Sequence, residues 1–382
     1  MIVLTAKGAL TGKNLEYFPN PAIVVDGGKI VDIVPSDSRK GGSYISSGEH
    51  IDLKDLTLMP GMIDSHAHLA MDARTEGHLM KMNDPEARQT IRAVRNVKDD
   101  IKAGITGLRC LGDKYYIDVE MRDFGAPDFP WMSVSGIGMK GIHGHGYVGM
   151  SFSGAEEFRR QARENIYRKV NWLKIFITPG TPPTGGAMTP WYMTREEVRA
   201  VTDEAKSQGI LTTAHCIGGT GLRYVAEEGI DTIEHCYWVT DEDIDLIIKH
   251  DKIVSFTSGI MLDPGREPMC PEAQNVKVRA TREESFRRMS KLVQAHPKFI
   301  IGSDAYHAML WREVMYMRQL GMDNLESLKG VTVYPGELYG NHVGSLESGY
   351  VADIIGVSGD PVEDASALSD PVFVMHNGKR FV

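Results

Sequence analysis

Eight short apolar segments, most of them followed by a helix-like stretch or a long loop, constrain the fold of this chain more than any other feature. Alternating strands and helices of this kind predict an α/β fold with a parallel sheet, most simply a (β/α)8 TIM barrel. The predicted strands are 58–66, 105–111, 131–137, 172–178, 210–215, 232–235, 253–257 and 299–304. The predicted helices are 85–103, 155–169, 195–208, 221–228, 241–249 and 279–295.

Both ends of the chain show a different pattern, with short strands and tight turns. Residues 22–31 contain two apolar runs around Asp26-Gly27-Gly28, which predicts a hairpin. Residues 352–357 and 372–381 have the same character. We therefore predict a small β-sandwich domain built from residues 1–57 and 339–382, flanking a barrel of residues 58–338.

Two histidines close the first predicted strand, in the sequence Asp64-Ser65-His66-Ala67-His68. Residues i and i+2 of a strand point to the same face, so His66 and His68 can both reach one metal ion. Other residues with metal-binding side chains close further predicted strands or lie within one. They are Lys174, His215, His235 and Asp304.

Each of these residues also has an ordinary explanation when it is considered alone. A histidine at a strand end is commonly a hydrogen-bonded core residue, and an aspartate after Gly-Ser is commonly a turn or a helix cap. Lys174 is harder to explain, because a lysine inside an apolar strand is costly to bury unless its charge is paired or removed. One binuclear metal site explains all six residues together, and its imidazole and carboxylate ligands suit zinc and related divalent ions.

These motifs closely resemble the amidohydrolase superfamily. The resemblance rests on Pro60-Gly61-Met62-Ile63-Asp64-Ser65-His66-Ala67-His68, the lysine of strand four, the histidines of strands five and six, and Gly302-Ser303-Asp304 of strand eight. The segment 344–355 also resembles the return of these proteins into their small β domain. The resemblance covers nearly the whole chain.

The resemblance implies a role for each residue. His66, His68 and Asp304 would hold one metal ion, and His215 and His235 the other. Lys174 would be carboxylated by carbon dioxide and bridge the two ions, for which zinc is the expected metal. A shared hydroxide would attack the substrate, and Asp304 would act as the general base and then the general acid.

The resemblance also narrows the reaction. Strand five reads His215-Cys216-Ile217-Gly218 and lacks the His-x-x-Glu of mononuclear deaminases, which favours cleavage of a small-molecule amide. The nearest resemblance is to the prolidase-like and metal carboxypeptidase group, which acts on dipeptides and N-acyl amino acids. A mononuclear deaminase or a ring-opening hydrolase of cyclic amides is the alternative. A degenerate barrel that serves only as a binding protein is a third hypothesis, against which the complete set of six residues speaks.

The substrate-binding residues are predicted from the loops. In the resembling group, a histidine in the Gly-His-Gly segment after strand three binds the substrate carboxylate. Here His145 is the first candidate and His143 the second, although both could be merely exposed. Tyr237 either lines the pocket or only packs. Arg223 and Arg266 either pair with a carboxylate or lie on the surface, and the Pro/Gly-rich segment 178–192 is either a lid or a rigid surface loop.

The composition excludes several classes of function. The net charge of −9 and the lack of a long basic run argue against nucleic acid as a partner. The four cysteines form no CxxC pair or disulfide pattern, and we see no signal peptide or membrane span, so we expect a cytoplasmic protein. By resemblance, the chain is expected to form a homo-oligomer.

Overall fold

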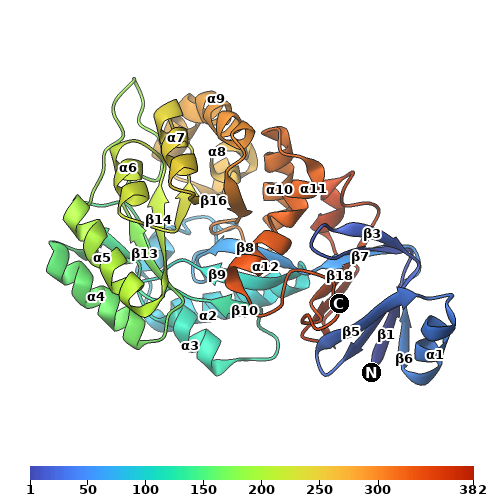
Figure 1. Cartoon of the computed structure of the whole chain (residues 1–382). Helices are drawn as coiled ribbons and strands as arrows, with labels where there is room; N and C mark the ends of the chain where they lie inside the picture. The colour runs from blue at the N-terminus through green and yellow to red at the C-terminus, as the bar shows by residue number, and fades with distance from the viewer.

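Parallel strands with helices around them form the larger part of the protein, on the left in Figure 1. The computed structural model describes residues 1–382. Three of its strands form one parallel sheet in the order β10-β9-β8, and seven form another in the order β12-β11-β13-β14-β15-β16-β17. These strands are β8 (Met62–Ala67), β9 (Ile105–Cys110), β10 (Trp131–Ser133), β11 (Met139–Gly141), β12 (Met150–Phe152), β13 (Trp172–Phe176), β14 (Leu211–Cys216), β15 (Thr232–His235), β16 (Ile253–Phe256) and β17 (Lys298–Ile301).

Backbone contacts join the two sheets at two places. Ala67 and Asp304 form an isolated parallel bridge, and the amide of His68 donates to the carbonyl of Asp304 at 3.1 Å. Beyond β10, the amide of Trp172 in β13 donates to the carbonyl of Val134 at 3.2 Å. The carboxyl ends of the strands therefore lie together at one end of this region.

The helices follow the predicted alternation. Two of them begin with a capping box: Thr194 with Glu197 for α5, and Thr240 with Asp243 for α7. The helices of this region are α2 (Glu86–Lys102), α3 (Ile117–Phe124), α4 (Ala155–Tyr167), α5 (Arg195–Gln208), α6 (Thr220–Glu227), α7 (Asp241–Lys249), α8 (Gly259–Leu262), α9 (Glu272–Gln294), α10 (Leu310–Gln319), α11 (Asn324–Lys329) and α12 (Val333–Tyr339), with 3₁₀ turns η1 (Met80–Asn83) and η2 (Pro264–Met269).

Strands from both chain ends share one sheet, as predicted. Its order is β20-β19-β18-β7-β2-β3, and a second sheet has the order β5-β4-β1-β6. Twelve buried residues, among them Leu4, Ile23, Leu58 and Phe373, form one apolar cluster with members from both sheets. The elements are β1 (Ile2–Thr5), β2 (Gly8–Thr11), β3 (Glu16–Pro19), β4 (Pro21–Asp26), β5 (Lys29–Pro35), α1 (Arg39–Ser47), β6 (Glu49–Asp52), β7 (Leu56–Pro60), β18 (Ile354–Ser358), η3 (Ala365–Ser369), β19 (Phe373–His376) and β20 (Lys379–Arg380).

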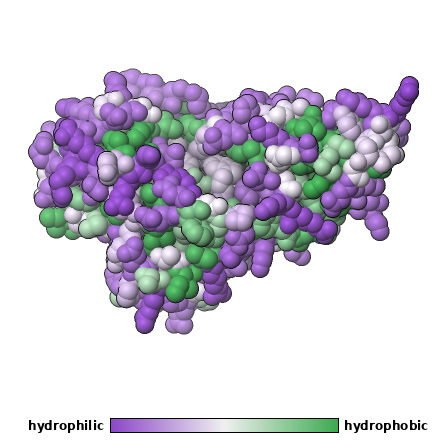
Figure 2. All heavy atoms as spheres, turned by 90° about the horizontal axis from the view of Figure 1, so that it is seen from below, coloured by the Kyte–Doolittle hydropathy of each residue, from purple (hydrophilic) through white to green (hydrophobic).

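The molecule is elongated, and these terminal strands lie at one end of it (Figures 1 and 2). The predicted hairpin is present, because β4 and β5 pair around Gly27 and Gly28, which both have positive φ. No helix of the structure has the length and apolar character needed to cross a membrane.

Three predicted elements differ from the structure. The predicted strand 58–66 is two strands, since β7 pairs with β18 in the terminal sheet and β8 starts only after Gly61. The predicted strand 131–137 ends at Ser133, and Gly136 has a φ of 66° that a strand does not accommodate. Helix α9 begins at Glu272, well before the predicted start at 279. The sequence pattern missed this part because the buried face of α9 includes polar residues such as Asn275, Thr281 and Ser285, which hide the apolar periodicity.

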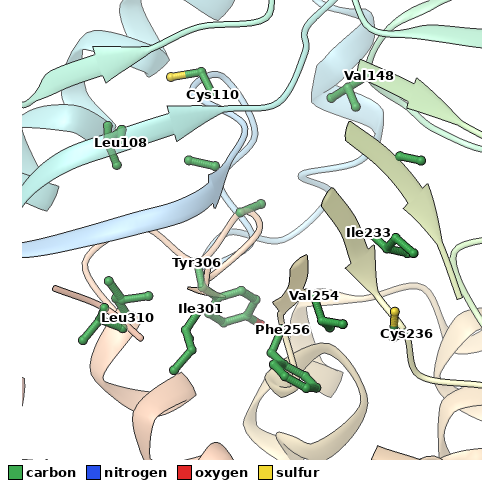
Figure 3. Close-up of a cluster of buried hydrophobic side chains, with 14 of the residues drawn as sticks. Leu108, Cys110, Val148, Ile233, Cys236, Val254, Phe256, Ile301, Tyr306 and Leu310 are labelled. Atoms are coloured by element: carbon green, nitrogen blue, oxygen red, sulfur yellow. The ribbon is translucent and has the colours of Figure 1, made fainter. Parts of the chain in front are cut away.

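Apolar side chains of the parallel strands fill the interior. One cluster of 69 buried residues includes Leu108 of β9, Ile233 of β15, Val254 of β16 and Ile301 of β17 (Figure 3). Cys236 belongs to the same cluster and is free and buried.

Candidate metal centre

His66, His68 and Asp304 come together at the carboxyl ends of β8 and β17. One ligand atom from each lies within 4.8 Å of the others, an arrangement that can hold a metal ion. The Nε2 atoms of His66 and His68 lie 3.9 Å and 3.6 Å from Asp304 Oδ1. Gly302 permits this approach, because a Cβ atom there would collide with the backbone nitrogen of His66. Asp304 lies beyond the end of β17 and has a φ of 66°, which aspartate tolerates better than most residues.

Hydrogen bonds at Nδ1 orient both histidines of β8. His66 Nδ1 lies 2.7 Å from Glu234 Oε2, and His68 Nδ1 lies 2.8 Å from the carbonyl oxygen of Gly112. In each case the acceptor favours a proton on Nδ1 and leaves the lone pair of Nε2 free for a metal. Burial keeps these rings neutral and lowers the pKa of His68 to about 3.

Glu234 is the centre of a buried polar network beneath this site. It accepts hydrogen bonds from Arg109 Nη2 at 2.8 Å and from the hydroxyls of Thr213 and Thr232 at 2.6 Å and 2.8 Å. Although burial alone would raise its pKa, Arg109 and His66 hold the pKa of Glu234 well below its usual range. Arg109 is itself fully buried, and its guanidinium stacks over Trp172 at 4.7 Å from the ring centroid. The network therefore fixes the orientation of His66 from below.

The Glu234→Gln variant tests this network. The amide keeps the shape but leaves the buried Arg109 cation without its counter-charge, so we expect a loss of about 3 kcal/mol in the free energy of unfolding. Catalytic activity should fall roughly 10- to 100-fold, as is usual when a partner of a metal-binding histidine is lost. Urea denaturation and steady-state kinetics would measure both effects. Glu227→Gln on α6 is the control, because its partly exposed pair with Arg195 is worth at most about 1 kcal/mol. Equal stability of the two variants would contradict this role of Glu234.

His235 and His215 lie next to the first group. The ring centroid of His235 is 4.8 Å from that of His66 and 4.4 Å from that of His215. His235 Nδ1 lies 2.7 Å from the Thr257 hydroxyl and 2.9 Å from the Tyr237 hydroxyl, whereas its buried Nε2 has no hydrogen-bond partner. His215 differs, because its Nε2 is 3.0 Å from the carbonyl oxygen of Pro179, and Nδ1 is then its free nitrogen.

Lys174 is fully buried in β13, as the sequence suggested, and does not point outward. Its Nζ atom has no hydrogen-bond partner, and burial is the largest cause that lowers its pKa to about 8. Buried nitrogens without hydrogen-bond partners, such as Lys174 Nζ and His235 Nε2, are expected where metal ions bind. These residues therefore fit the metal ions that the sequence implies.

A cavity of about 510 Å³ opens above these residues. Its wall includes His68, His215, His235 and Asp304, so all of these reach one space. This volume is within the usual range for small-ligand sites.

The predicted substrate-binding residues all lie in the wall of this cavity. Burial lowers the pKa of His145 to about 4, and its ring centroid is 5.0 Å from that of His215. His143 is exposed at the rim, with its ring 5.4 Å from that of Tyr192. Tyr237 lines the cavity, but its hydroxyl is already bonded to His235 and Thr257.

The ends of the segment 178–192 also line the cavity, through Pro179, Gly180, Thr181 and Tyr192. Its middle does not, and Met188 there is 70% exposed. Of the two arginines considered, Arg223 is exposed outside the cavity, and Arg266 is buried in its wall.

Sequence reasoning assigned no role to several residues that the structure places around the site. Asp64 accepts hydrogen bonds from the amides of His66 and Ser303, at 3.0 Å and 2.9 Å, and so ties the loop of Asp304 to β8. His78 is buried in the cavity wall. Arg109 and Glu234 carry charges within apolar strands, the same signal that singled out Lys174, although this signal does not reveal that the two residues pair.

The chain was compared with known proteins. Residues 57–380 match the sequence model of the amidohydrolase family. The chain belongs to the amidohydrolase family. Ochratoxinase from Aspergillus niger is 23% identical over 419 residues, an alignment that covers 100% of this chain and 86% of that enzyme. A 5′-deoxyadenosine deaminase from Methanopyrus kandleri is 23% identical over 339 residues, which cover 79% of this chain and 73% of the deaminase.

Solved structures of this family agree over the whole length. A Xaa-Pro dipeptidase with methionine bound in its active site has a TM-score of 0.85 and 25% identity, and the match covers 100% of this chain and 99% of the dipeptidase. The predicted membership of the amidohydrolase superfamily is thus confirmed. This amidohydrolase is an enzyme that hydrolyses carbon–nitrogen bonds, and its His66, His68 and Asp304 offer a possible metal site of the kind on which the family depends.

Proposed function

We propose that this amidohydrolase cleaves an amide bond of a dipeptide or N-acyl amino acid at a binuclear metal centre. One observation carries the proposal: two buried, unpartnered nitrogens, Lys174 Nζ and His235 Nε2, lie within the group of ligand-type residues formed by His66, His68, His215 and Asp304. Unpaired buried polar atoms are costly, and bound cations remove that cost for imidazole nitrogens.

The residues divide into two sets in this proposal. His66, His68 and Asp304 would hold one ion, His215 and His235 the other, and Lys174 would contact both. When bound, divalent ions of this kind supply Lewis acidity and activate water near neutral pH. The chain orients the ligands through Glu234, Gly112 and Thr257, each of which holds the Nδ1 atom of one histidine.

Lys174 would serve as a carboxylated lysine. Its neutral amine attacks carbon dioxide, a C–N bond forms, and one proton is released to solvent. The lowered pKa, about 8, supports this step because it increases the neutral fraction of the amine near pH 7. The product is an anion in place of a buried cation, which offsets the positive charge of the ions.

Asp304 would move the proton. Its carboxylate lies at the cavity wall between the two histidines of β8 and is held in a fixed backbone conformation. It would accept a proton from the attacking water and donate it to the leaving nitrogen. Although its burial opposes ionisation, its interactions with His66, His68 and Arg266 hold the pKa of Asp304 below its usual range.

The amide class of substrate is supported by relatives whose names include a Xaa-Pro dipeptidase and an ochratoxinase. His145 would contact the substrate from the loop after β11, and Gly180 leaves room for its ring. Tyr237 would act mainly on His235, to which its hydroxyl is bonded.

We also infer that the parallel strands close into a barrel. The Ala67–Asp304 bridge and the Trp172–Val134 hydrogen bond support closure of the strands from β8 to β17 into a (β/α)8 barrel. The apolar cluster between the two terminal sheets supports a small β-sandwich domain. The site would then lie at the carboxyl face of the barrel, where such folds hold their chemistry.

A substrate panel tests the reaction. The purified enzyme, loaded with Zn²⁺, would be assayed with dipeptides that include Xaa-Pro, with N-acyl amino acids and with amino-purine nucleosides. Amide cleavage without ammonia release is the expected result. Ammonia release from the nucleosides would instead favour the second candidate, a mononuclear deaminase, which the relative from Methanopyrus kandleri keeps open.

A further inference from the structure

Arg266 is a buried cation in the cavity wall without a counter-ion. It lies in η2, only 8% of its surface is exposed, and its Nη1 atom has no hydrogen-bond partner. Glu313 and Asp304 interact with it electrostatically, but neither forms an ion pair with its side chain. Most arginines of this chain form ion pairs, so the lack of a partner for Arg266 requires a physical explanation.

Neighbouring acids of the same segment are committed elsewhere. Asp263 accepts from Arg312 at 2.8 Å. Glu267 pairs with Arg279 at 2.9 Å and with Arg282 at 2.6 Å. The segment therefore neutralises its own carboxylates with other arginines and leaves Arg266 free to face the cavity.

Tyr306 holds the guanidinium in place. The central carbon of the Arg266 guanidinium lies 3.6 Å from the centroid of the Tyr306 ring, which is close stacking. Tyr306 belongs to the same buried cluster as Ile301 and Phe256, so the ring is a fixed platform (Figure 3). Its own hydroxyl is buried and has no hydrogen-bond partner. One wall of the cavity thus contains two unpartnered polar groups, Arg266 Nη1 and the Tyr306 hydroxyl, and Tyr306 is two residues along the chain from Asp304.

A planar anion can pair with both the Arg266 guanidinium and the Tyr306 hydroxyl. An unpaired buried cation is strongly unfavourable, and an anionic ligand removes the cost. A guanidinium with fixed orientation matches a carboxylate, which can accept two of its N–H groups and also the hydroxyl proton of a tyrosine. The cavity of about 510 Å³ has room for a molecule of dipeptide size beside the metal-binding residues.

We propose that Arg266 and Tyr306 bind a carboxylate of the substrate and so make this enzyme selective for amide substrates that carry a carboxylate group. This inference rests on the proposed function, and it names the class of substrate. The carboxylate comes either from the α-carboxyl group of the amino-acid part or from an Asp or Glu side chain. Arg266 is a specificity-determining residue in both cases.

Kinetics on matched substrate pairs test the proposal. One pair is a dipeptide and its C-terminal amide, and the other is Ala-Glu and Ala-Gln. We expect the native enzyme to prefer the acid of at least one pair by roughly 100-fold in kcat/KM, mainly through KM. In Arg266→Gln this preference should fall below about fivefold. In Arg266→Lys, which keeps the charge but lacks the planar guanidinium and its paired N–H donors, the preference should be intermediate. Arg279→Gln is the control and should keep the full preference, because Arg279 lies on α9 and is paired with Glu267 and Glu272 at the surface.

Binding without turnover separates this inference from the proposed reaction. The probes are N-acetyl-glutamate, N-acetyl-glutamine and N-acetyl-glutamine amide, and the measurement is the shift in Tm of the metal-loaded protein. Stabilisation that is lost at the first step of this series identifies the side-chain carboxylate, and loss at the second step identifies the α-carboxylate. Carboxylate-dependent stabilisation that is absent in Arg266→Gln but present in Arg279→Gln supports the subsite, even if no amide is cleaved. Equal preference for the acid in the native enzyme and in Arg266→Gln, or no stabilisation of the native enzyme by any probe, would overturn it.

Discussion

Replacement of Lys174 with alanine is expected to lower kcat/KM by at least about 10³-fold, because the variant loses the one side chain assigned to both ions. Lys174→Met should be equally inactive, since it fills nearly the same space in β13 without an amine. In the metal-free protein, neither variant should be less stable than the native protein by more than a cavity explains, because a buried amine without a partner contributes nothing to stability. Kinetics, metal content and urea denaturation of the purified variants measure these three properties.

The comparison of alanine with methionine decides the cause of the loss. If Met restored activity, the role of Lys174 would be packing. Lys298→Ala is the control, because this lysine is at the start of β17 and its side chain is 61% exposed. Unchanged turnover together with full metal content in Lys174→Ala would contradict the binuclear mechanism.

Asp304→Asn is expected to lower kcat by roughly 10²- to 10⁴-fold, the range for loss of a general acid–base group. Asparagine keeps the size of the side chain and an oxygen that can face the ions, and it also tolerates a positive φ, so the fold and most of the metal should be retained. The loss would then fall on proton transfer, and KM should change little. Steady-state kinetics and metal analysis on the same sample would show this separation.

Asp251→Asn is a closely matched control. Asp251 also has a positive φ, 53°, but lies at the surface beside Lys298. We expect native kinetics for this variant. A similar loss of kcat in both variants, or native kcat in Asp304→Asn, would argue against Asp304 as the proton carrier.

The residues that the sequence predicted best are those whose position follows from local rules. His66 and His68 share a face because strand residues alternate, and parallel strands bring their carboxyl ends together. Helices α5 and α7 match their predicted bounds, since each begins with a capping box that the sequence itself contains.

Contacts and backbone conformations that depend on packing between distant segments were not predicted. Arg109 and Glu234 meet from β9 and β15, which are not neighbours in either sheet, so no local pattern reveals the pair. Asp304 was predicted to close the strand 299–304, but β17 ends at Ile301, because the bridge of Asp304 to Ala67 and its positive φ depend on the approach of β8. Arg266 is in a 3₁₀ turn without periodicity, and only the commitments of its acidic neighbours show that it is unpaired.

The metal content of the active enzyme, measured per chain while amide cleavage is assayed on the same sample, tests the central claim most directly. The account predicts about two divalent ions per chain, and removal of the ions by a chelator should abolish amide cleavage until they are added back. A single ion per chain at full activity, with ammonia released from amino-heterocycles and no amide cleaved, would contradict it.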